Sequence, residues 1–150
     1  MRRLFILDLD NTLIYAFPGS YQGGNILFHY SSYLTIIKRP YAEKLIRKCQ
    51  SAGEVMVFTT SVKDYAESVC RHLDIKPVAL FTREDCLISG GMYQKFVPGY
   101  YYEKYDSITI LDDNPQMWDQ RSRERCKVIF VPPFYGEEDD EELGKIQFEL

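Results

Sequence analysis

LFILDLDNTL, at residues 4–13, is the stretch that decides the fold, because four consecutive apolar residues lead directly into Asp8. An apolar run without alternation is typical of a strand that is buried on both faces, as in a parallel sheet. Two later runs have the same form: VMVF leads into Thr59, and ITIL leads into Asp112. Ligands in open α/β sheets lie beyond the carboxyl ends of the strands, so we expect the three endings to meet in one crevice.

Helical and turn-forming segments separate these runs. Pro40 is tolerated at the start of a helix, and Gly53 is well placed to end it. The predicted elements are strands at 4–7, 55–58, 78–81, 108–111 and 127–131, helices at about 40–52 and 62–74, a hairpin of NILFHY and YLTIIK within the turn-rich stretch 15–39, a tight turn at 90–91, and a last helix opened by the acidic run 137–142. Their alternation indicates an α/β fold with a mostly parallel sheet flanked by helices. A length of 150 residues is usual for one domain, so we expect residues 1–150 to form a single domain.

Composition and charge narrow the class of protein. An apolar fraction of 45% and a charged fraction of 27% are ordinary for a globular protein, and no apolar run reaches the length of a transmembrane helix. A net charge of -4 argues against a nucleic-acid partner, whose phosphates usually require a basic face. The four cysteines form no C-x-x-C pair, which favours reduced thiols over a zinc site. We therefore expect an intracellular protein, cytoplasmic or nuclear, with neither a membrane nor a nucleic acid as its partner.

Four carboxylates would share the predicted crevice, those of Asp8, Asp10, Asp112 and Asp113. Such a group repels itself when it is empty, and its acids tend to hold protons. A divalent cation and a nearby lysine would remove the repulsion, and ligation by oxygen alone favours Mg²⁺ over zinc. Taken singly, an aspartate pair that follows a strand is more often a helix cap or part of a turn. Their joint position at the ends of buried strands is what indicates a Mg²⁺ site.

The same segments resemble the motifs of haloacid-dehalogenase phosphatases. DLDNTL at 8–13 matches the D-x-D-x-T signature, VFTTS resembles the second motif, and LDDNP resembles the acidic fourth motif. Within that superfamily the chain resembles the FCP/SCP group, phosphatases that act on the C-terminal domain of RNA polymerase II. The segments that carry this closer resemblance are KRPYAEKL (38–45), FTTSVKDYAESV (58–69), TREDC (82–86), YQK (93–95) and LDDNPQMW (111–118). The resemblance implies a haloacid-dehalogenase-like fold and a phosphatase activity.

Two positions depart from the pattern of the FCP/SCP group. Many members have Glu where this chain has Asn11, and the smaller members usually have Asn where it has Asp113. The larger branch has an Asp pair at the second position and also carries a separate phosphopeptide-binding domain, for which these 150 residues offer no candidate. The superfamily assignment survives both departures, whereas the physiological substrate does not follow from it.

The resemblance implies catalytic and metal-binding roles for three of the acidic residues. Asp8 would attack phosphorus and become an aspartyl-phosphate, which splits one hard displacement into two. Asp10 would protonate the leaving oxygen and then deprotonate the water that hydrolyses the intermediate. Asp8, the backbone carbonyl of Asp10, and Asp113 would hold Mg²⁺.

Other polar residues would support these three. Thr59, Thr60 and neighbouring backbone N–H groups would hold the phosphate, and Lys95 would balance the charge of the nucleophile and the phosphoryl group. Asp112 would order waters or the lysine, and Thr12 would brace the loop.

The lysine is the least constrained of these assignments. Lys95 follows a Gly-Gly turn and lies between the second and fourth motifs, as the family requires. Lys104 is a rival in the same interval. We favour Lys95 because YQK copies the local pattern of the family.

The spacing of the motifs predicts the kind of substrate. About forty residues separate the first two motifs, too few for a helical cap, so we expect small β-hairpin insertions and no large cap domain. An uncapped site suits a phosphorylated side chain of a protein or peptide, which favours a Mg²⁺-dependent phosphoprotein (Ser/Thr) phosphatase. Two alternatives stay open: a phosphatase for a small-molecule or nucleic-acid-end phosphate, and a catalytically silent phosphopeptide-binding module.

Overall fold

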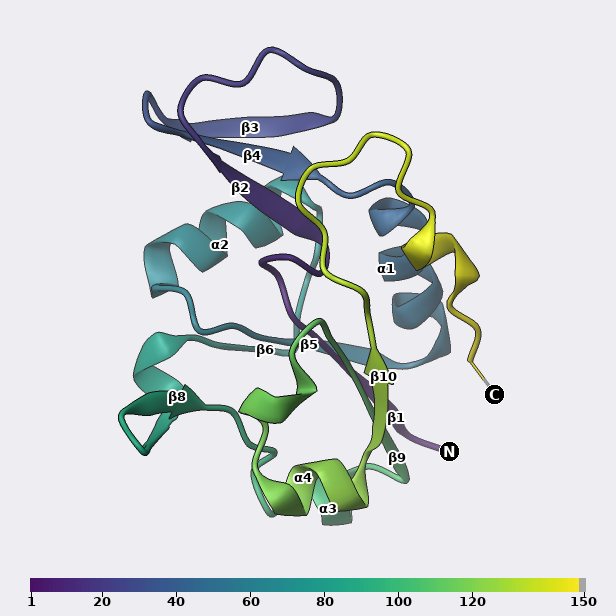
Figure 1. The fold of residues 1–150 in the computed structure, drawn as a ribbon. Helices are drawn as coiled ribbons and strands as arrows, with labels where there is room; N and C mark the ends of the chain where they lie inside the picture. Colours follow the sequence, from purple (N-terminus) through teal and green to yellow (C-terminus); the bar gives the residue numbers. More distant parts are fainter. Residues whose placement is uncertain (149–150) are drawn as a thin grey trace.

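The computed structural model describes residues 1–148, and at its centre is a five-stranded parallel sheet. The spatial order of the strands is β10-β9-β1-β5-β6, and every neighbouring pair runs in parallel. The strands are β1 (Arg3–Leu7), β5 (Glu54–Phe58), β6 (Ala79–Phe81), β9 (Ser107–Asp112) and β10 (Lys127–Phe130). The five predicted strands and the parallel sheet are confirmed (Figure 1).

The register of this sheet brings the polar endings of the strands to one level. Leu7, the last residue of the central strand, pairs with Val57 on one side and with Leu111 on the other. Asp8 N then donates to the Leu111 carbonyl at 3.1 Å, so that Asp8 and Asp112 leave the sheet beside each other. The polar endings therefore lie together beyond the carboxyl ends of the central strands, where the sequence predicts the crevice.

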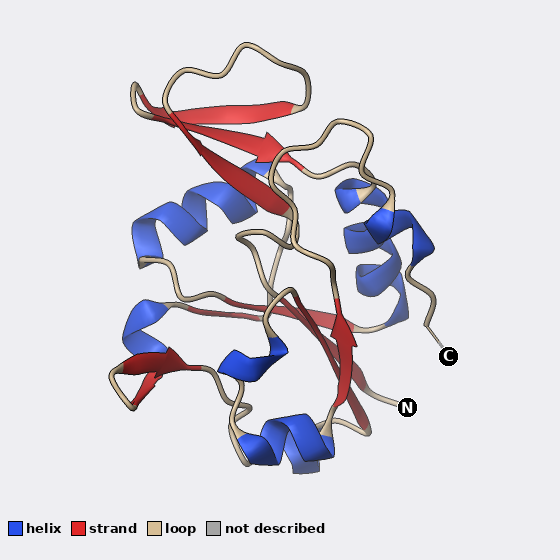
Figure 2. Cartoon of the chain, in the orientation of Figure 1, coloured by secondary structure: helices blue, strands red, loops and turns tan. Residues whose placement is uncertain are grey.

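Helices cover both faces of the sheet, because successive side chains of a strand point to opposite faces. One face packs against α1 (Ala42–Ala52) and α2 (Lys63–His72), which confirms the two predicted helices. The opposite face packs against α3 (Tyr101–Lys104) and the segment around Trp118, with α4 (Gln120–Arg125) beside them (Figure 2). Within the described part of the chain, no helix is both long and apolar enough to cross a membrane.

A three-stranded antiparallel sheet is inserted between β1 and α1, and Figure 1 shows it beyond the carboxyl edge of the parallel sheet. Its strands are β2 (Ile14–Pro18), β3 (Ile26–Ser31) and β4 (Leu34–Lys38), in the order β2-β4-β3. The predicted hairpin is the β3/β4 pair. β2 is a strand within the stretch that the sequence predicts only as turn-rich. It forms by pairing with the distant β4, Tyr15 opposite Ile37, and Pro18 and Gly19 mark its end.

A smaller insertion lies on the other side of the crevice. β7 (Leu87–Ser89) and β8 (Met92–Gln94) form a hairpin that turns at Gly90 and Gly91, whose φ angles of 58° and 77° favour glycine. Within residues 1–148 the insertions are these two small sheets and no large cap domain is present, as the motif spacing predicts.

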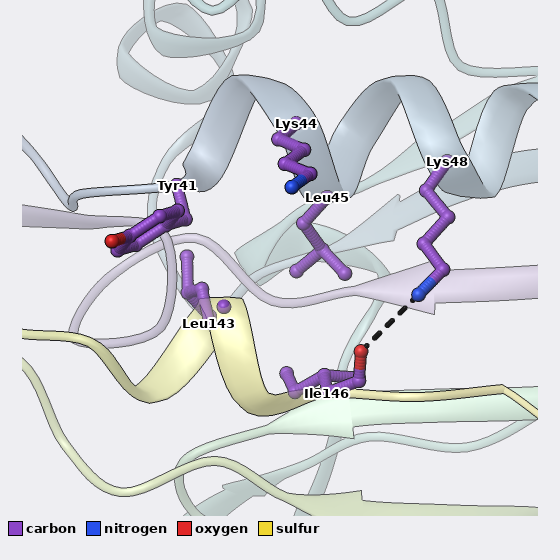
Figure 3. A pocket seen from close by; sticks show the side chains of 7 residues that line it. Tyr41, Lys44, Leu45, Lys48, Leu143 and Ile146 are labelled. Atoms are coloured by element: carbon purple, nitrogen blue, oxygen red, sulfur yellow. Dashed lines mark hydrogen bonds between the residues drawn. The ribbon is translucent and has the colours of Figure 1, made fainter.

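The prediction of a last helix opened by the acidic run is wrong. Residues 137–141 lie in turns and loop, and a short 3-10 helix, η3 (Glu142–Lys145), follows them. Leu143 of η3 packs into the hydrophobic core that includes the buried face of α1. Lys48 Nζ of α1 donates to the Ile146 carbonyl at 3.3 Å (Figure 3). Asp140 bonds to the buried guanidinium of Arg39, and its Oδ1 also accepts from Glu142 N at 3.2 Å, at the start of η3.

Candidate active site

The loop after β1 is folded tightly onto itself. The backbone N–H groups of Thr12, Leu13 and Ile14 all donate to the Leu9 carbonyl, at 3.1, 2.9 and 3.2 Å. Asn11 adopts a left-handed φ of 65°, a conformation that asparagine tolerates better than most residues. This turn holds the side chain of Thr12, which is fully buried, against the end of the strand.

Asp8 lies at the base of the crevice with 7% of its surface exposed. Its Oδ2 accepts a hydrogen bond of 2.7 Å from Thr12 Oγ1, and its Oδ1 accepts one of 3.0 Å from Lys95 Nζ. Burial raises the pKa of the Asp8 carboxyl to about 6, although the ammonium of Lys95 opposes the shift. The same Thr12 hydroxyl accepts from Asp113 N at 3.0 Å and lies 3.2 Å from Asp113 Oδ1, so it joins the first and fourth motifs.

Lys95 is buried between two carboxylates. Its Nζ lies 3.0 Å from Asp8 Oδ1 and 2.8 Å from Asp112 Oδ2, and its side chain is 2% exposed. Burial alone would lower the pKa of this ammonium, but the two carboxylates outweigh burial and raise the pKa above its ordinary value. Lys104 is exposed at the end of α3 with its Nζ over the ring of Tyr105, and the structure brings Lys95 to the nucleophile instead.

Both oxygens of Asp112 are occupied by donors from the protein. Oδ2 accepts from Lys95 and, at 2.9 Å, from Trp118 Nε1, while Oδ1 accepts from Asn114 N at 2.8 Å. Burial and the neighbouring Asp8 raise the pKa of Asp112 to about 6. Asp112 is 1% exposed, whereas Asp8 is 7% exposed and Asp113 is half-buried, so Asp8 and Asp113 are the more accessible carboxylates of the three.

The acidic cluster fits the chemistry of a magnesium ion. One carboxylate oxygen from each of Asp8, Asp112 and Asp113 lies within 4.8 Å of the other two. Burial raises the pKa of all three carboxyls, and Lys95 supplies one positive charge against three potential negative ones. Hard oxygen donors at this spacing suit Mg²⁺, which would lower the repulsion that the lysine leaves.

The Asp10 carboxylate lies outside the cluster of Asp8, Asp112 and Asp113 and is held by two hydroxyl groups. Ser61 Oγ donates to its Oδ2 at 2.6 Å, and Tyr65 OH donates to its Oδ1 at 2.7 Å. Neither hydroxyl is predicted from the sequence to take part in the site. Tyr65 lies in the helix predicted at 62–74. A buried tyrosine hydroxyl usually finds a hydrogen-bond partner, and this is the one signal that could have indicated its bond to Asp10.

The segment after β5 lies beside Asp10, to which its Ser61 donates. Thr59 is buried, its N–H donates to the Phe81 carbonyl at 3.0 Å, and its hydroxyl accepts from Ser61 N at 3.1 Å. Thr60 is half-buried, and its carbonyl accepts from Arg83 Nε at 2.9 Å. The structure therefore brings the predicted residues of all four motifs to one edge of the sheet.

The family follows from a comparison with family models. The model of the NLI interacting factor-like phosphatases matches residues 3–150, nearly the whole chain. The chain belongs to this family. The resemblance to haloacid-dehalogenase phosphatases of the FCP/SCP type is thereby confirmed.

Curated relatives of this phosphatase family carry names of the same kind. The chain is 25% identical over 142 residues to an RNA polymerase II C-terminal domain phosphatase of Encephalitozoon cuniculi, covering 90% of this chain and 33% of the relative. It is 28% identical over 117 residues to the human carboxy-terminal domain RNA polymerase II polypeptide A small phosphatase 2, covering 73% and 43%. It is 25% identical over 130 residues to the zebrafish (Danio rerio) CTD nuclear envelope phosphatase 1B, covering 76% and 53%. The chain thus spans between a third and about half of the length of these relatives.

A solved structure supports the fold. The structure of Fcp1, described as an essential RNA polymerase II CTD phosphatase, superposes with a TM-score of 0.63 at 23% identity, over 89% of this chain and 42% of that one. The expected haloacid-dehalogenase-like fold is confirmed by this match.

Proposed function

We propose that the protein is a Mg²⁺-dependent phosphomonoester hydrolase that works through an aspartyl-phosphate on Asp8. The observation that carries the proposal is the environment of Asp8, which is bonded to Lys95 at 3.0 Å and to Thr12 at 2.7 Å and faces Asp113 across the crevice. A carboxylate held between a cation and a hydroxyl, with a second carboxylate nearby, is a fixed nucleophile beside a cation site.

The reaction proceeds in two displacements. An oxygen of Asp8 bonds to phosphorus while the bond from phosphorus to the ester oxygen breaks, and Asp10 gives the leaving oxygen a proton. Asp10 then takes a proton from a water molecule whose oxygen attacks phosphorus, which releases inorganic phosphate and restores Asp8. The hydrogen bonds from Ser61 and Tyr65 hold the Asp10 carboxyl in place for both transfers.

The charge of the phosphoryl group is balanced from two directions. Lys95 approaches from the sheet side, where it is held by Asp8 and Asp112. Bound Mg²⁺ would neutralise phosphoryl oxygens and orient them for displacement. Asp8, Asp113 and the backbone carbonyl of Asp10 would hold the ion, and Thr59 and Thr60 would bind the remaining phosphoryl oxygens.

The substrate that we propose is phosphoserine or phosphothreonine in an extended segment of a protein. The two small insertions leave the crevice uncapped within residues 1–148, so that a side chain can enter without the closure of a lid. The relatives whose names mention the C-terminal domain of RNA polymerase II act on a protein, which agrees with this class of substrate.

Hydrolysis of para-nitrophenyl phosphate tests the chemistry. We expect activity with Mg²⁺, loss of activity with EDTA, and loss of activity in Asp8→Asn. Asp139→Asn is the matched control, because Asp139 is exposed and the substitution changes the same functional group away from the crevice. A panel of phosphopeptides, sugar phosphates and 5′-phosphorylated oligonucleotides then separates the classes of substrate. Undiminished turnover by Asp8→Asn would contradict the proposal.

A further inference from the structure

The chain that follows β10 forms a strap, residues 131–140, that runs across the backbones of two catalytic motifs. It begins where Val131 N donates to the Asp112 carbonyl at 3.0 Å. It continues past Phe134, whose side chain is fully buried, and ends at Asp140. In Figure 1 this yellow-green segment rises from the parallel sheet toward the base of the antiparallel one. The proposed mechanism assigns no role to these residues.

The strap is joined to the nucleophile loop by a reciprocal pair of hydrogen bonds. Phe134 N donates to the Asn11 carbonyl at 2.8 Å, and Asn11 Nδ2 donates to the Phe134 carbonyl at 3.0 Å. Asn11 also adopts a left-handed φ of 65°. An asparagine at this position therefore supplies both the tight turn and a link to the strap.

Arg39 makes the second connection between the strap and the loop. Its side chain is fully buried, and its Nη1 donates to the Thr12 carbonyl at 3.1 Å. Its Nη2 donates to the Pro132 carbonyl at 2.7 Å, and Asp140 accepts from Nε and Nη2 at 2.8 and 3.0 Å. The ring of Phe134 lies 5.3 Å from the guanidinium carbon. A planar guanidinium with a bidentate carboxylate fixes geometry more tightly than a single ion pair does.

Thr12 connects this framework to the reacting groups. Its carbonyl is held by Arg39, while its hydroxyl bonds to Asp8 at 2.7 Å and to Asp113 N at 3.0 Å. A shift of the Thr12 backbone would move the nucleophile and the cation-binding carboxylate relative to each other. We propose that Arg39, Asp140 and Asn11 are positioning residues, through which the strap fixes the distance between Asp8 and Asp113. This inference rests on the proposed roles of Asp8 and Asp113.

Two substitutions each remove one interaction of the strap and leave the side chains of Asp8, Asp10, Lys95 and Asp113 unchanged. Asp140→Asn removes the charge that pairs with Arg39, and Asn11→Gly keeps the left-handed backbone but removes the amide that bonds to Phe134. Asp139→Asn is the matched control, since it makes the same change one residue earlier at an exposed side chain. For each variant, the measurements are the thermal midpoint, the Mg²⁺ Kd by calorimetry, and kcat and KM for para-nitrophenyl phosphate at a temperature where circular dichroism shows it folded.

We expect kcat to fall about tenfold or more in both variants while KM changes little, because small misplacements of reacting groups slow the reaction more than they weaken substrate binding. The Mg²⁺ Kd should rise severalfold in both variants, and Asp139→Asn should match the wild type. Variants that lose thermal stability but keep the wild-type kcat and Mg²⁺ Kd would overturn the inference, since a strap that only supports the fold gives that result. If Asp140→Asn does not fold, Asn11→Gly decides by the same criteria. A wild type without phosphatase activity counts against the proposed function, and the calorimetric comparison still tests the strap.

Discussion

Lys95→Met is the substitution that probes the electrostatics of the crevice most strongly. The wild-type ammonium lies 3.0 Å from Asp8 and 2.8 Å from Asp112, and all three groups are buried. Methionine nearly conserves the volume, so the main change is that two buried carboxyls lose their common counter-charge. Breaking a buried ion pair in this way costs roughly 3–5 kcal/mol of the free energy of unfolding. We expect a loss of this size at pH 7.5 in EDTA.

The loss of unfolding free energy in Lys95→Met should depend on pH, and the direction of this dependence follows from the pKa values of the two carboxyls. In the wild type, burial raises the pKa of Asp8 and Asp112 to about 6 from an ordinary 3.8, with Lys95 opposing the shift. Without Lys95 the folded-state pKa values rise further, while the unfolded-state values do not change. The folded variant therefore binds more protons than its unfolded chain over a wider range of pH, and its stability falls as pH rises through that range. The difference between variant and wild type should be largest at pH 7.5 and should shrink toward pH 4.5.

Urea unfolding followed by the fluorescence of Trp118, the only tryptophan of the chain, measures the effect at each pH. Lys104→Met is the control at an exposed lysine, where we expect a change within about 0.5 kcal/mol. A loss for Lys95→Met below about 1 kcal/mol, or one that stays constant between pH 4.5 and 7.5, would refute the idea that Lys95 neutralises the two carboxyls.

Three further predictions concern other parts of the molecule. Asp113→Ala removes both the charge and the side-chain oxygens, so it should raise the thermal midpoint of the metal-free protein at neutral pH and should abolish the midpoint increase that Mg²⁺ gives the wild type; an increase as large as in the wild type would exclude Asp113 as a ligand. Tyr65→Phe removes a hydrogen bond to the Asp10 carboxylate and should lower kcat by about tenfold or more while KM changes little; an unchanged kcat would show that the hydroxyl does not position Asp10. Burial raises the pKa of the Cys49 and Cys70 thiols to about 12, so at pH 8 both should react with a disulfide reagent such as DTNB only after unfolding, and rapid labelling of either in the native protein would contradict this.

The strands and the location of the crevice were predictable because they depend on local sequence. Each apolar run that ends in an oxygen-bearing residue is a buried strand, and the parallel register then places Asp8 beside Asp112. Lys95 was predictable from its local pattern, although the structure adds that its charge is shared with Asp112.

The parts that could not be predicted from the sequence depend on contacts between distant segments. β2 exists because it pairs with β4, and Asp140 of the acidic run bonds to Arg39, 101 residues away. Arg39 precedes the helix predicted at about 40–52, and nothing in the sequence indicates that its side chain is buried. Tyr65 lies at a position of the helix that fits an apolar core residue equally well, so its bond to Asp10 required the structure.

The measurement that tests the central claim most directly is chemical trapping of the intermediate. The wild-type protein is mixed with Mg²⁺ and a phosphomonoester, quenched during turnover, and treated with borohydride, which reduces an aspartyl-phosphate to homoserine. Peptide mass spectrometry then locates the change. We predict homoserine at position 8, absent when substrate or Mg²⁺ is omitted and absent in Asp8→Asn. Homoserine at another aspartate, or an unmodified Asp8 during rapid turnover under conditions that trap a control aspartyl-phosphate enzyme, would contradict the account.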